Sequence, residues 1–453
     1  MSQTSAAADR TSPASPGRDP VAVVGLGYVG LPLALALAGT GTRVVGVDTS
    51  ARVRDALAEG RPLFVEPGVE EALRARTPEE FAVTDRLPDT PPRAVIICVG
   101  TAVHPGTREP DLRHLRAAAE HVADHIADDT LVVVRSTIPV GTCRELVLPL
   151  LRRRVANPLL AFCPERIIQG QAMAELASLP QIIGGLDHAS TARAGELLKS
   201  VASDQITVSS LEAAEMIKLI CNAHTDLLYG FGNEVALLAA PLGLDAEELI
   251  STANLRYPRP DLARPGYVGG SCLTKDPYLL MHTAERAGRR PPLVAAAREV
   301  NEQVPGHVVE RVLAALERTG RPAASAKVLV CGIAYKGRPV TDDVRGAAAV
   351  QVAAELRDRV GVLAGHDFVV EPDRIAELGY RPMELGEGLT DADALVLLVD
   401  HPGYARPENT AHLRRMRRPA VVFDMWGLLR AEFGAPGGSG GQGGVEYLRL
   451  GRG

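Results

Sequence analysis

Short apolar runs alternate with segments of helical periodicity between residue 21 and about residue 200. The runs are VAVVGLG, TRVVGVD, RAVIICVG, TLVVVRST and QIIGG, and Ala/Leu-rich segments lie between several of them. Runs of this length, bounded by glycine and polar residues, are typical of buried strands. Alternation of such strands with helices predicts a doubly wound α/β domain in which all these runs are parallel strands.

The pattern becomes helical from about residue 204 to about residue 303, with SLEAAEMIKLICNAHTDLLYGFGNEVALLAAPLGL as one long amphipathic stretch. Its apolar positions exceed what one buried face needs, which predicts a helical middle domain that forms a homodimer surface. After Lys327, the runs KVLVCGIAY, ALVLLVD and AVVFDMW predict a second, smaller α/β domain. The expected division is a disordered tail (1–19), a Rossmann domain (20–203), a helical dimerisation domain (204–303) and an α/β domain (304–453).

The ends of the chain have distinct compositions. The first 19 residues contain no apolar core, so we expect no secretory signal there. Near the other end, the run GAPGGSGGQGG predicts a flexible loop, and VEYLRLGRG predicts a last edge strand. The cysteines follow no regular spacing, which favours reduced thiols and a cytoplasmic location. They are Cys98, Cys143, Cys163, Cys221, Cys272 and Cys331.

Charge and hydropathy exclude two classes of partner. The formal net charge of −6 argues against a nucleic-acid-binding protein, which usually concentrates basic residues on one face. No apolar run reaches the roughly 20 residues that a membrane-spanning helix needs. Only five of the 49 basic residues are lysines, so each lysine inside a motif suggests that a compact ammonium is required there. Three of these lysines, Lys218, Lys275 and Lys336, lie in the motifs below.

The first strand is followed by the spacing Gly-x-Gly-x-x-Gly and then by a helical pattern. Glycines at these positions permit a tight turn and let the backbone approach a pyrophosphate at the helix N-terminus. Asp48 ends the second strand, where its carboxylate can bind ribose hydroxyls and favours NAD over NADP. A glycine-rich turn without a ligand is the alternative. The residues that we expect to contact NAD are Gly25, Gly27, Tyr28, Val29, Gly30, Asp48, Thr101 and Thr137.

The stretch GYVGGSCLTKDPY surrounds one thiol with unusual neighbours. Cys272 follows three glycines and precedes Lys275 and Asp276 by three and four residues, in what we interpret as a flexible loop. A nucleophilic cysteine needs a thiolate and a group that stabilises the oxyanion it generates. Asp276 is a candidate general base for water. Its structural alternative is a helix N-cap before Pro277, and both roles can coexist.

The long middle helix supplies candidate partners for this thiol. Glu215, Lys218 and Asn222 are spaced i, i+3, i+7 and share one face, where a cation and an amide can stabilise developing negative charge. A solvated salt bridge between Glu215 and Lys218 is the simpler interpretation of that pair. Asn222 stands among apolar residues, so its amide requires a partner. Thr137 lies at a strand end, and Glu165 and Arg166 follow a proline in a loop.

Two other chemistries find little support. His121 and His125 have i, i+4 spacing, but no HExxH pattern and no third ligand accompany them. We therefore expect surface histidines and no metal. A serine hydrolase is equally unsupported, because no GxSxG elbow occurs.

Taken together, the motifs resemble those of the UDP-sugar 6-dehydrogenases, from about residue 20 to the C-terminus. The shared stretches are GLGYVGLP, LFVEPGVEEAL, STIPVGT, PER, ExxKLxxN, GGSCLTKD and GIAYKG…TDDVR. The resemblance implies an NAD-binding Rossmann domain, a helical dimer-forming connector and a C-terminal UDP-binding domain. It also implies oxidation of a sugar C6 alcohol to a carboxylate, which explains the thiol: the intermediate aldehyde must be held between two hydride transfers.

The same resemblance suggests roles for individual residues. Cys272 matches the nucleophile, Lys218 and Asn222 the oxyanion stabilisers, and Asp276 the residue that helps to activate water. Thr137 and Glu165 match neighbours of the reacting centre, and Lys336 a lysine that reaches the substrate from the last domain; Arg345 matches a motif arginine whose contact we leave unassigned. The residues expected to bind the UDP-sugar are Glu165, Arg166, Lys218, Asn222, Arg259, Gly269 and Lys336.

Departures from the family pattern bear on the substrate. Gln169 stands where UDP-glucose dehydrogenases usually carry a second glutamate, and the segments around it and before Cys272 look more like the branch that acts on UDP-N-acetylmannosamine. By that resemblance Arg259 reaches a substrate across the dimer interface. UDP-glucose and UDP-N-acetylglucosamine are the alternative substrates. A dehydrogenase that stops after one hydride and a non-catalytic nucleotide-sugar binding protein are the alternative functions.

Overall fold

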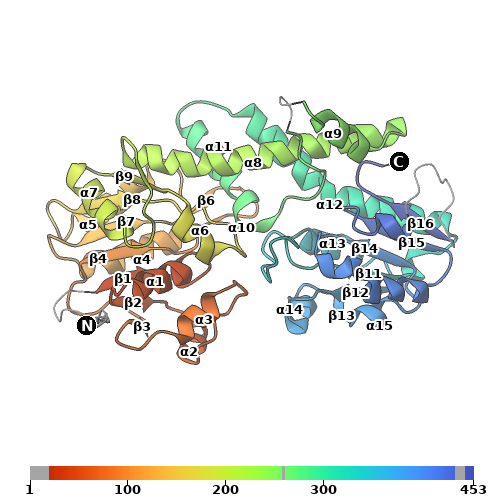
Figure 1. Ribbon diagram of the computed structural model, residues 1–453. Coiled ribbons are helices and arrows are strands. Elements are labelled where there is room, and N and C mark those ends of the chain that lie inside the picture. Colours follow the sequence, from red (N-terminus) through yellow and green to blue (C-terminus); the bar gives the residue numbers. More distant parts are fainter. Residues whose placement is uncertain (1–19, 258–260, 434–443, 453) are drawn as a thin grey trace, which may run out of the picture.

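The computed structural model describes residues 20–257, 261–433 and 444–452. Two α/β units lie side by side, and the long helix α8 (Leu211–Ala239) runs from one to the other (Figure 1). The predicted tail, most of the predicted glycine-rich loop and Arg259 lie outside the described residues. Among the described residues, no helix combines the length and the apolar character needed to cross a membrane.

The first unit is built on an eight-stranded sheet in the order β10-β9-β8-β7-β4-β1-β2-β3. The chain leaves β1 to form β2 on one side and β4 on the other, so the order reverses next to β1, where doubly wound sheets bind ligands. The strands are β1 (Val21–Val24), β2 (Val44–Val47), β3 (Phe81–Thr84), β4 (Ala94–Ile97), β7 (Leu131–Val134), β8 (Leu159–Phe162), β9 (Gln181–Gly185) and β10 (Gln205–Thr207).

One predicted strand has the wrong direction. The run QIIGG forms β9, but β9 pairs antiparallel with β8 and parallel only with β10. The connection between β8 and β9 holds just the short helix α6 (Ala172–Ser178), so the chain turns back along the sheet without a full crossover. The remaining predicted strands of this unit are parallel, as expected.

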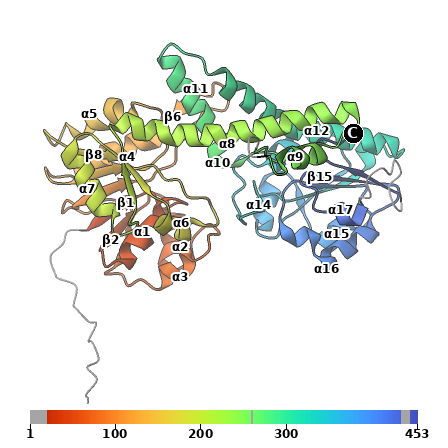
Figure 2. The same cartoon turned by 45° about the horizontal axis from the view of Figure 1, so that its top comes forward.

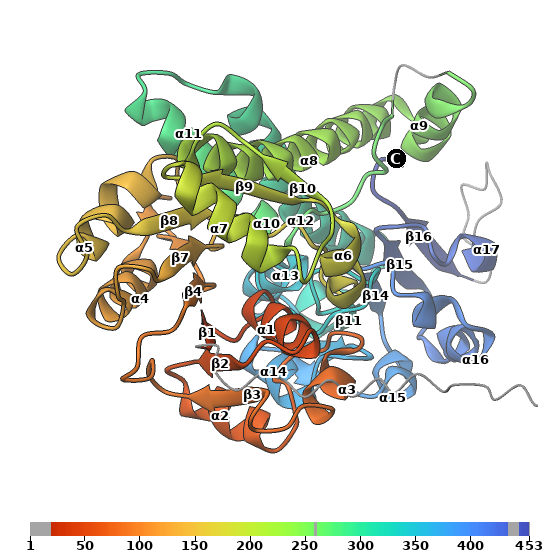
Figure 3. The same cartoon turned by 60° about the vertical axis from the view of Figure 1, so that its left-hand side comes forward.

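Helices cover both faces of this sheet, because alternate strand residues point to opposite sides. Val21 and Val23 pack in one core with α1 (Gly30–Gly39), whereas Ala22 and Val24 pack in the other with α4 (Arg113–Asp124). Figure 3 shows the strands in order from β9 to β3 between these two layers. The further elements are α2 (Ala51–Ala58), α3 (Val69–Arg74), β5 (Ala102–Val103), β6 (Pro110–Asp111), η1 (Cys143–Val147), α5 (Leu148–Leu151) and α7 (His188–Leu198).

The middle of the chain is helical, as predicted. The side chain of Ser210 caps α8 by accepting a hydrogen bond from the Ala213 amide at 3.1 Å, and α8 then packs along α12 (Pro292–Arg318). The expected boundary after residue 303 falls inside α12, so a continuous helix joins the middle to the last unit. The shorter helices are η2 (Ala240–Leu242), α9 (Ala246–Asn254), α10 (Gly270–Leu273) and α11 (Asp276–Arg286).

The last unit contains a second parallel sheet in the order β13-β12-β11-β14-β15-β16. The predicted edge strand is confirmed, since among the described strands β16 pairs with β15 alone. The strands are β11 (Lys327–Cys331), β12 (Val362–His366), β13 (Arg381–Pro382), β14 (Ala394–Leu397), β15 (Ala420–Asp424) and β16 (Val445–Leu448). The helices are η3 (Ala323–Ser325), α13 (Ala348–Leu356), α14 (Pro372–Glu377), α15 (Leu385–Leu389), η4 (Pro402–Ala405), α16 (Pro407–Thr410), η5 (Ala411–Arg415) and α17 (Arg430–Phe433).

Candidate active site

The turn between β1 and α1 leaves room for a ligand. Gly25 has a φ of +93°, which residues with side chains rarely adopt, and a Cβ on Gly30 would lie 1.8 Å from the Gly25 carbonyl oxygen. A Cβ on Gly27 would meet nothing within 4 Å. The N–H groups of residues 27–29 donate to no other described residue, and no side chain caps α1. Free donors at a helix N-terminus fit the pyrophosphate of a dinucleotide.

Asp48 lies beside this turn with a fixed orientation. Its Oδ2 accepts a hydrogen bond from the Leu26 amide at 3.0 Å, and its Oδ1 accepts one from the Ser50 amide at 2.9 Å. The half-buried carboxylate thus stands at the end of β2, next to the glycines that would hold the pyrophosphate. This is the position where an acidic residue binds ribose hydroxyls in dinucleotide-binding folds.

Cys272 does not lie in a flexible loop, contrary to the sequence-based interpretation. It is the third residue of the four-residue helix α10, which lies against α8 (Figure 2), and it is exposed. Tyr335 and Lys336 of the last unit lie close to it: burial, and after it the charge on Cys272, raise the pKa of Tyr335, and the same charge makes an upward contribution to the pKa of Lys336. Burial lowers the pKa of Lys336 and outweighs this contribution. The thiol therefore lies where the middle helices meet the last unit.

The close contact between this segment and the last unit explains the glycines before Cys272. At three positions of the segment 266–273, a Cβ would come closer than 3.0 Å to an atom of the last unit, a distance that real Cβ atoms avoid. The pairs are Gly266 with Trp426 (2.3 Å), Gly269 with Gly346 (2.3 Å) and Gly270 with Tyr335 (2.8 Å). Glycine thus lets the two surfaces approach closely, rather than making the segment mobile.

Asp276 and Asn222 come together as predicted. Asp276 is fully buried, and its Oδ2 accepts a hydrogen bond from Asn222 Nδ2 at 2.5 Å. Its Oδ1 accepts one from Lys275 Nζ, also at 2.5 Å. Lys218 is only 8% exposed, yet it forms no hydrogen bond or ion pair with another residue that the structure describes. A buried cation without a protein partner can bind an oxyanion of a ligand.

Two structural alternatives from the sequence are wrong. Glu215 does not pair with Lys218; it is fully buried and accepts hydrogen bonds from the backbone amides of Gly141 (2.6 Å) and Cys143 (2.9 Å). Burial raises the pKa of Glu215 to about 7. Asp276 is not an N-cap either, because α11 begins at Asp276 itself and no side chain caps it. The fixed orientation of both side chains comes from contacts across the sequence that spacing could not indicate.

Two threonines connect the first sheet to the cysteine segment. Thr101 and Thr137 follow β4 and β7, and the Thr101 hydroxyl donates to the Thr137 carbonyl at 2.6 Å. Lys275 Nζ donates to the Thr101 hydroxyl at 3.2 Å. The carboxyl end of β4 thereby contacts Lys275, the residue that also binds Asp276, and Thr101 connects it to the end of β7. This places both expected cofactor contacts beside the candidate catalytic residues.

Glu165 and Arg166 are held mainly by the protein. Glu165, 7% exposed, forms an ion pair with the buried Arg135, and its Oε1 accepts hydrogen bonds from the amides of Arg166 (2.7 Å) and Ile167 (3.1 Å). The guanidinium of Arg166 donates to the Pro180 carbonyl at 2.5 Å. A contact of either side chain with substrate stays a prediction.

The last unit reaches the first through two sets of side chains. Lys336 Nζ donates to the Gln169 carbonyl at 2.7 Å, and Gln169 Nε2 donates to Asp343 Oδ2 at 3.1 Å. Tyr28, inside the glycine turn, donates from its hydroxyl to Asp342 Oδ1 at 3.0 Å, and the Arg345 guanidinium lies 5.2 Å from the Tyr28 ring centre. The predicted cofactor turn and the predicted substrate lysine therefore face one shared region.

The histidine pair is partly different from expectation. His121 and His125 are half-buried rather than at the surface, and His121 Nε2 accepts a hydrogen bond from the Leu87 amide at 3.0 Å. The described residues hold no cluster of three His, Cys, Asp or Glu side chains arranged for a metal. None of the six cysteines forms a disulfide.

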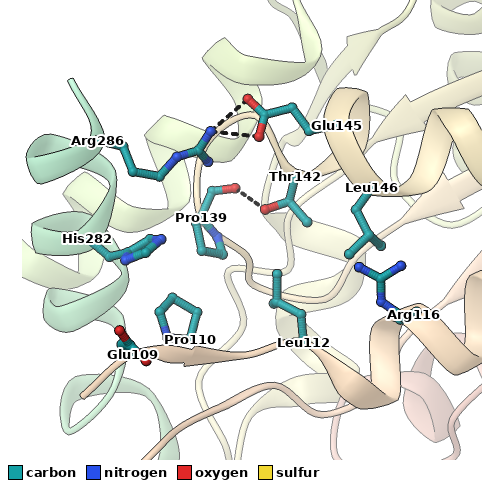
Figure 4. A pocket seen from close by; sticks show the side chains of 10 residues that line it. All are labelled: Glu109, Pro110, Leu112, Arg116, Pro139, Thr142, Glu145, Leu146, His282 and Arg286. Carbon is teal, nitrogen blue, oxygen red and sulfur yellow. Dashed lines mark hydrogen bonds and ion pairs between the residues drawn. The ribbon is translucent and has the colours of Figure 1, made fainter. Parts of the chain in front are cut away.

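A cavity of about 380 Å³ lies apart from these residues, between α4, η1 and α11 (Figure 4). Arg286 points toward Glu145 and donates to it at 2.7 Å, which closes one side of the cavity. It contains none of the predicted site residues. The lining residues are Glu109, Pro110, Leu112, Arg116, Pro139, Thr142, Glu145, Leu146, His282 and Arg286.

Three sequence profiles of one family match successive parts of the chain. The NAD binding domain of the UDP-glucose/GDP-mannose dehydrogenase family matches residues 19–202, its central domain residues 212–303, and its UDP binding domain residues 329–431. The chain belongs to the UDP-glucose/GDP-mannose dehydrogenase family. The predicted architecture of a Rossmann domain, a helical connector and a C-terminal UDP-binding domain is thereby confirmed.

Individual relatives agree. The UDP-N-acetyl-D-mannosamine dehydrogenase of Escherichia coli K12 is 34% identical over 403 residues, covering 84% of this chain and 93% of the relative. The solved UDP-D-ManNAc dehydrogenase of Pyrococcus horikoshii has a TM-score of 0.85 at 31% identity and covers 96% and 99% of the two chains. A UDP-glucose dehydrogenase of Pyrobaculum islandicum has a TM-score of 0.81 at 28% identity, covering 98% and 100%. The chain is an NAD-dependent nucleotide-sugar 6-dehydrogenase.

Three residues that bind the predicted site segments were not predicted from the sequence: Arg135, Asp343 and Glu66. Arg135 directly follows an apolar strand and belongs to no motif of polar residues. Asp343 belongs to the TDDVR motif, but the motif alone does not indicate its contact with Gln169. Glu66, only 6% exposed, accepts hydrogen bonds from the amides of Gly170 (2.7 Å) and Ala172 (2.8 Å). Its motif, LFVEPGVEEAL, was the available signal, but the partners lie more than 100 residues away.

Proposed function

We propose that this enzyme oxidises UDP-N-acetyl-D-mannosamine at C6 to the uronic acid, with Cys272 as the nucleophile. The observation that carries this proposal is the exposed Cys272 thiol on α10, which contacts α8, together with the buried Lys218 and Asp276 and the half-buried Asn222. The E. coli and P. horikoshii relatives named above favour this sugar, as does Gln169 in place of the glutamate usual in glucose enzymes.

The chemistry requires two hydride transfers to two molecules of NAD, which supply the oxidising power. The C6 alcohol first becomes an aldehyde. The Cys272 thiolate adds to the aldehyde carbon to form a thiohemiacetal, and loss of the second hydride converts this to a thioester. Water then attacks the thioester carbonyl, the carbon–sulfur bond breaks, and the thiolate is regenerated. The sum is alcohol, water and two NAD giving carboxylate, two NADH and three protons.

The proposed roles follow from charge and hydrogen bonding. Lys218 has no hydrogen-bond or ion-pair partner among the described residues, so its ammonium can stabilise the oxygen at C6 while that oxygen carries negative charge. Asn222 adds a donor on the same helix face. Asp276 assists the attacking water, and its bonds to Asn222 and Lys275 hold its carboxylate in one orientation.

Substrate contacts are proposed from the region shared by the two nucleotide units. Lys336 reaches across from the last unit to Gln169 and would bind the diphosphate or the sugar, as would Gly269. Thr137, Glu165 and Arg166 would line the reacting end. Arg259, whose proposed contact crosses a dimer interface, lies outside the described residues.

We also propose a homodimer formed through the middle helices. Large apolar side chains remain exposed along α8, which a single copy of the chain does not cover. They are Met216, Ile220, Leu228, Phe231 and Leu238. Sedimentation analysis is expected to give twice the 48.0 kDa chain mass, and a monomer at micromolar concentration would contradict the proposal.

Substrate choice is tested by incubating the protein with NAD and UDP-N-acetylmannosamine, UDP-glucose or UDP-N-acetylglucosamine, with products identified by mass. We expect two NADH per sugar and the highest kcat/KM for UDP-N-acetylmannosamine. Preference for UDP-glucose, which the similarity to the P. islandicum enzyme keeps as the second candidate, would overturn the substrate assignment. One NADH per sugar would overturn the two-step oxidation itself.

The role of Cys272 has its own test. Cys272→Ala is expected to lower the rate of acid formation by about 10³-fold or more, because the aldehyde loses its covalent acceptor. NAD affinity should stay within about twofold, since the glycine turn is untouched. Cys221→Ala is the matched control, because Cys221 is also exposed but lies on α8 outside the proposed site. Acid formation at the wild-type rate by Cys272→Ala would contradict the mechanism.

A further inference from the structure

The segment that carries Cys272 is held at both ends by buried polar side chains. At its start, the Asn233 amide binds both backbone groups of Gly266: Oδ1 accepts from Gly266 N at 2.8 Å, and Nδ2 donates to Gly266 O at 2.9 Å. At its end, Arg298 Nη1 donates to the carbonyl of Leu273 at 2.7 Å. Asn233 belongs to α8 and Arg298 to α12.

These two anchors are parts of one continuous network. Asn233 Nδ2 also donates to Asn301 Oδ1 at 2.8 Å, and Asn301 Nδ2 donates to Asp226 Oδ1 at 2.8 Å. Asp226 Oδ1 in turn accepts from Arg298 Nη1 at 2.7 Å. All four residues are at most 1% exposed. An uninterrupted chain of hydrogen bonds therefore runs from Gly266 to Leu273 through the interior of α8 and α12.

Burying such a network between two helices has a free-energy cost, because its charged groups lose their contact with water. Asp226 Oδ2 and Arg298 Nη2 are buried without a hydrogen-bond partner among the described residues. Replacing a buried ion pair by apolar residues is often neutral or stabilising, so stability alone does not explain the arrangement. The hydrogen bonds that the network does form are directional, and directional bonds exclude alternative packings. The geometry specified here is that of the segment 266–273.

The short helix α10 needs this support. It has only four residues, too few to be stable by itself, and Cys272 is exposed, so burial of its side chain does not fix its position. The glycines permit close approach to the last unit but supply no side chains. The position of Cys272 Sγ thus depends on what holds the two ends of its segment.

We propose that Arg298, together with Asn233, is a positioning residue for Cys272, acting through the backbone at Leu273 and Gly266. This inference rests on the proposed nucleophilic role of Cys272. A misplacement of about 1 Å can cost about 100-fold in rate, so loosening either anchor should impair addition of the thiolate to the aldehyde. The first oxidation needs no bond to sulfur and should change much less.

The test compares three variants. Arg298→Met leaves Asp226 as an unpaired buried charge, so the informative variant is the uncharged double replacement Asp226→Asn with Arg298→Met. It is expected to form acid about 10- to 100-fold more slowly, while a hydroxylamine trap captures released aldehyde that wild type retains. Arg298→Lys should partly restore acid formation, because an ammonium has three donors for Asp226 and Leu273. Alkylation of Cys272 by iodoacetamide, located by peptide mass, should change in rate for the double variant only.

Val304→Ala is the matched control. Val304 is fully buried on the same helix but is no part of the network, so its loss should lower the melting temperature without releasing aldehyde. If the folded double variant forms acid at the wild-type rate with no trapped aldehyde, the positioning role is wrong. If instead the nucleophilic role of Cys272 is wrong, Cys272→Ala will retain acid formation with Arg298 unchanged. The failure of that role can therefore be told apart from the failure of the positioning role.

Discussion

The two sheets have nearly the same turn after their first strands, but different surroundings. Gly25 follows β1 with a φ of +93°, and Gly332 follows β11 with a φ of +84°. In both cases the glycine amide donates to the neighbouring strand, Gly25 to the Val47 carbonyl at 2.8 Å and Gly332 to the His366 carbonyl at 3.0 Å. Only the first turn is matched by the dinucleotide motif.

The difference lies in which amides remain free. After Gly25, the backbone N–H groups of residues 27–29 donate to no described residue, and α1 starts directly at Gly30. After Gly332, the amides of Ile333 (2.7 Å) and Ala334 (3.1 Å) both donate to Asp367 Oδ2. The protein's own carboxylate thus occupies the donors that a phosphate would use. Sheet topology alone does not create a dinucleotide site; free amides at a helix start do.

The largest expected effect comes from filling the open turn. Gly27→Val should weaken NAD binding by about 10³-fold, because at least two charge-assisted hydrogen bonds of ~1.5–3 kcal/mol each would be blocked. Its melting temperature should barely change, since a Cβ at this position meets nothing within 4 Å. Isothermal titration and thermal unfolding measure the two quantities.

Gly332→Ala is the matched control. A Cβ there would lie 2.3 Å from Val399, so this variant should lose stability but bind NAD normally once folded. Equal loss of NAD affinity in both variants would contradict the contrast between the turns.

A second effect concerns the pH dependence of stability. It arises from Glu215, whose carboxylate accepts hydrogen bonds from two backbone amides of the first unit. Burial raises the pKa of Glu215 from 4.5 to about 7, so the folded protein binds the proton more tightly than the unfolded chain. The associated stabilisation is complete below pH 4.5 and is lost as the pH rises through about 7. The loss amounts to about 3 kcal/mol at most.

Urea unfolding of wild type and Glu215→Gln across this pH range measures the effect. Glu215→Gln should lack this part of the pH dependence, because glutamine does not titrate. Parallel pH profiles for the two proteins would show that Glu215 does not titrate in this range.

The smallest expected effect concerns Lys336, a side chain of the last unit that we propose to bind the UDP-sugar. Lys336→Met should raise KM for the UDP-sugar about 10-fold, through loss of one charge-assisted hydrogen bond. NAD affinity should be unchanged. Lys327→Met is the control, because Lys327 begins β11, the strand that precedes Lys336, and its Nζ donates to the carbonyls of Glu387 (3.0 Å) and Thr390 (2.8 Å) instead. An unchanged KM for Lys336→Met would contradict the proposed contact between Lys336 and the UDP-sugar.

Much of the fold could be predicted because its central strands are long apolar runs. The strands that were missed, such as β3 (Phe81–Thr84) and β12 (Val362–His366), carry weaker runs, and β12 contains glycine and histidine. The direction of β9 was wrong because strand orientation depends on the path between strands, which a run such as QIIGG does not encode.

The candidate site was predictable in its residue types but not in its contacts. Cys272, Lys218 and Asp276 stand in compact motifs, so their presence together could be inferred. The partners that orient the site lie far away along the chain, as Glu215 does from Gly141 and Cys143. Hydrogen bonds of that kind arise from tertiary packing, and no local spacing reveals them.

The three glycines before Cys272 have a consequence for exchanging parts between relatives. Each touches a different residue of the last unit: Trp426, Gly346 or Tyr335. A chimera that takes its last unit from another enzyme will fit this segment only if the incoming surface leaves the same three hollows. The segment and the surface facing it therefore have to be inherited, or redesigned, together.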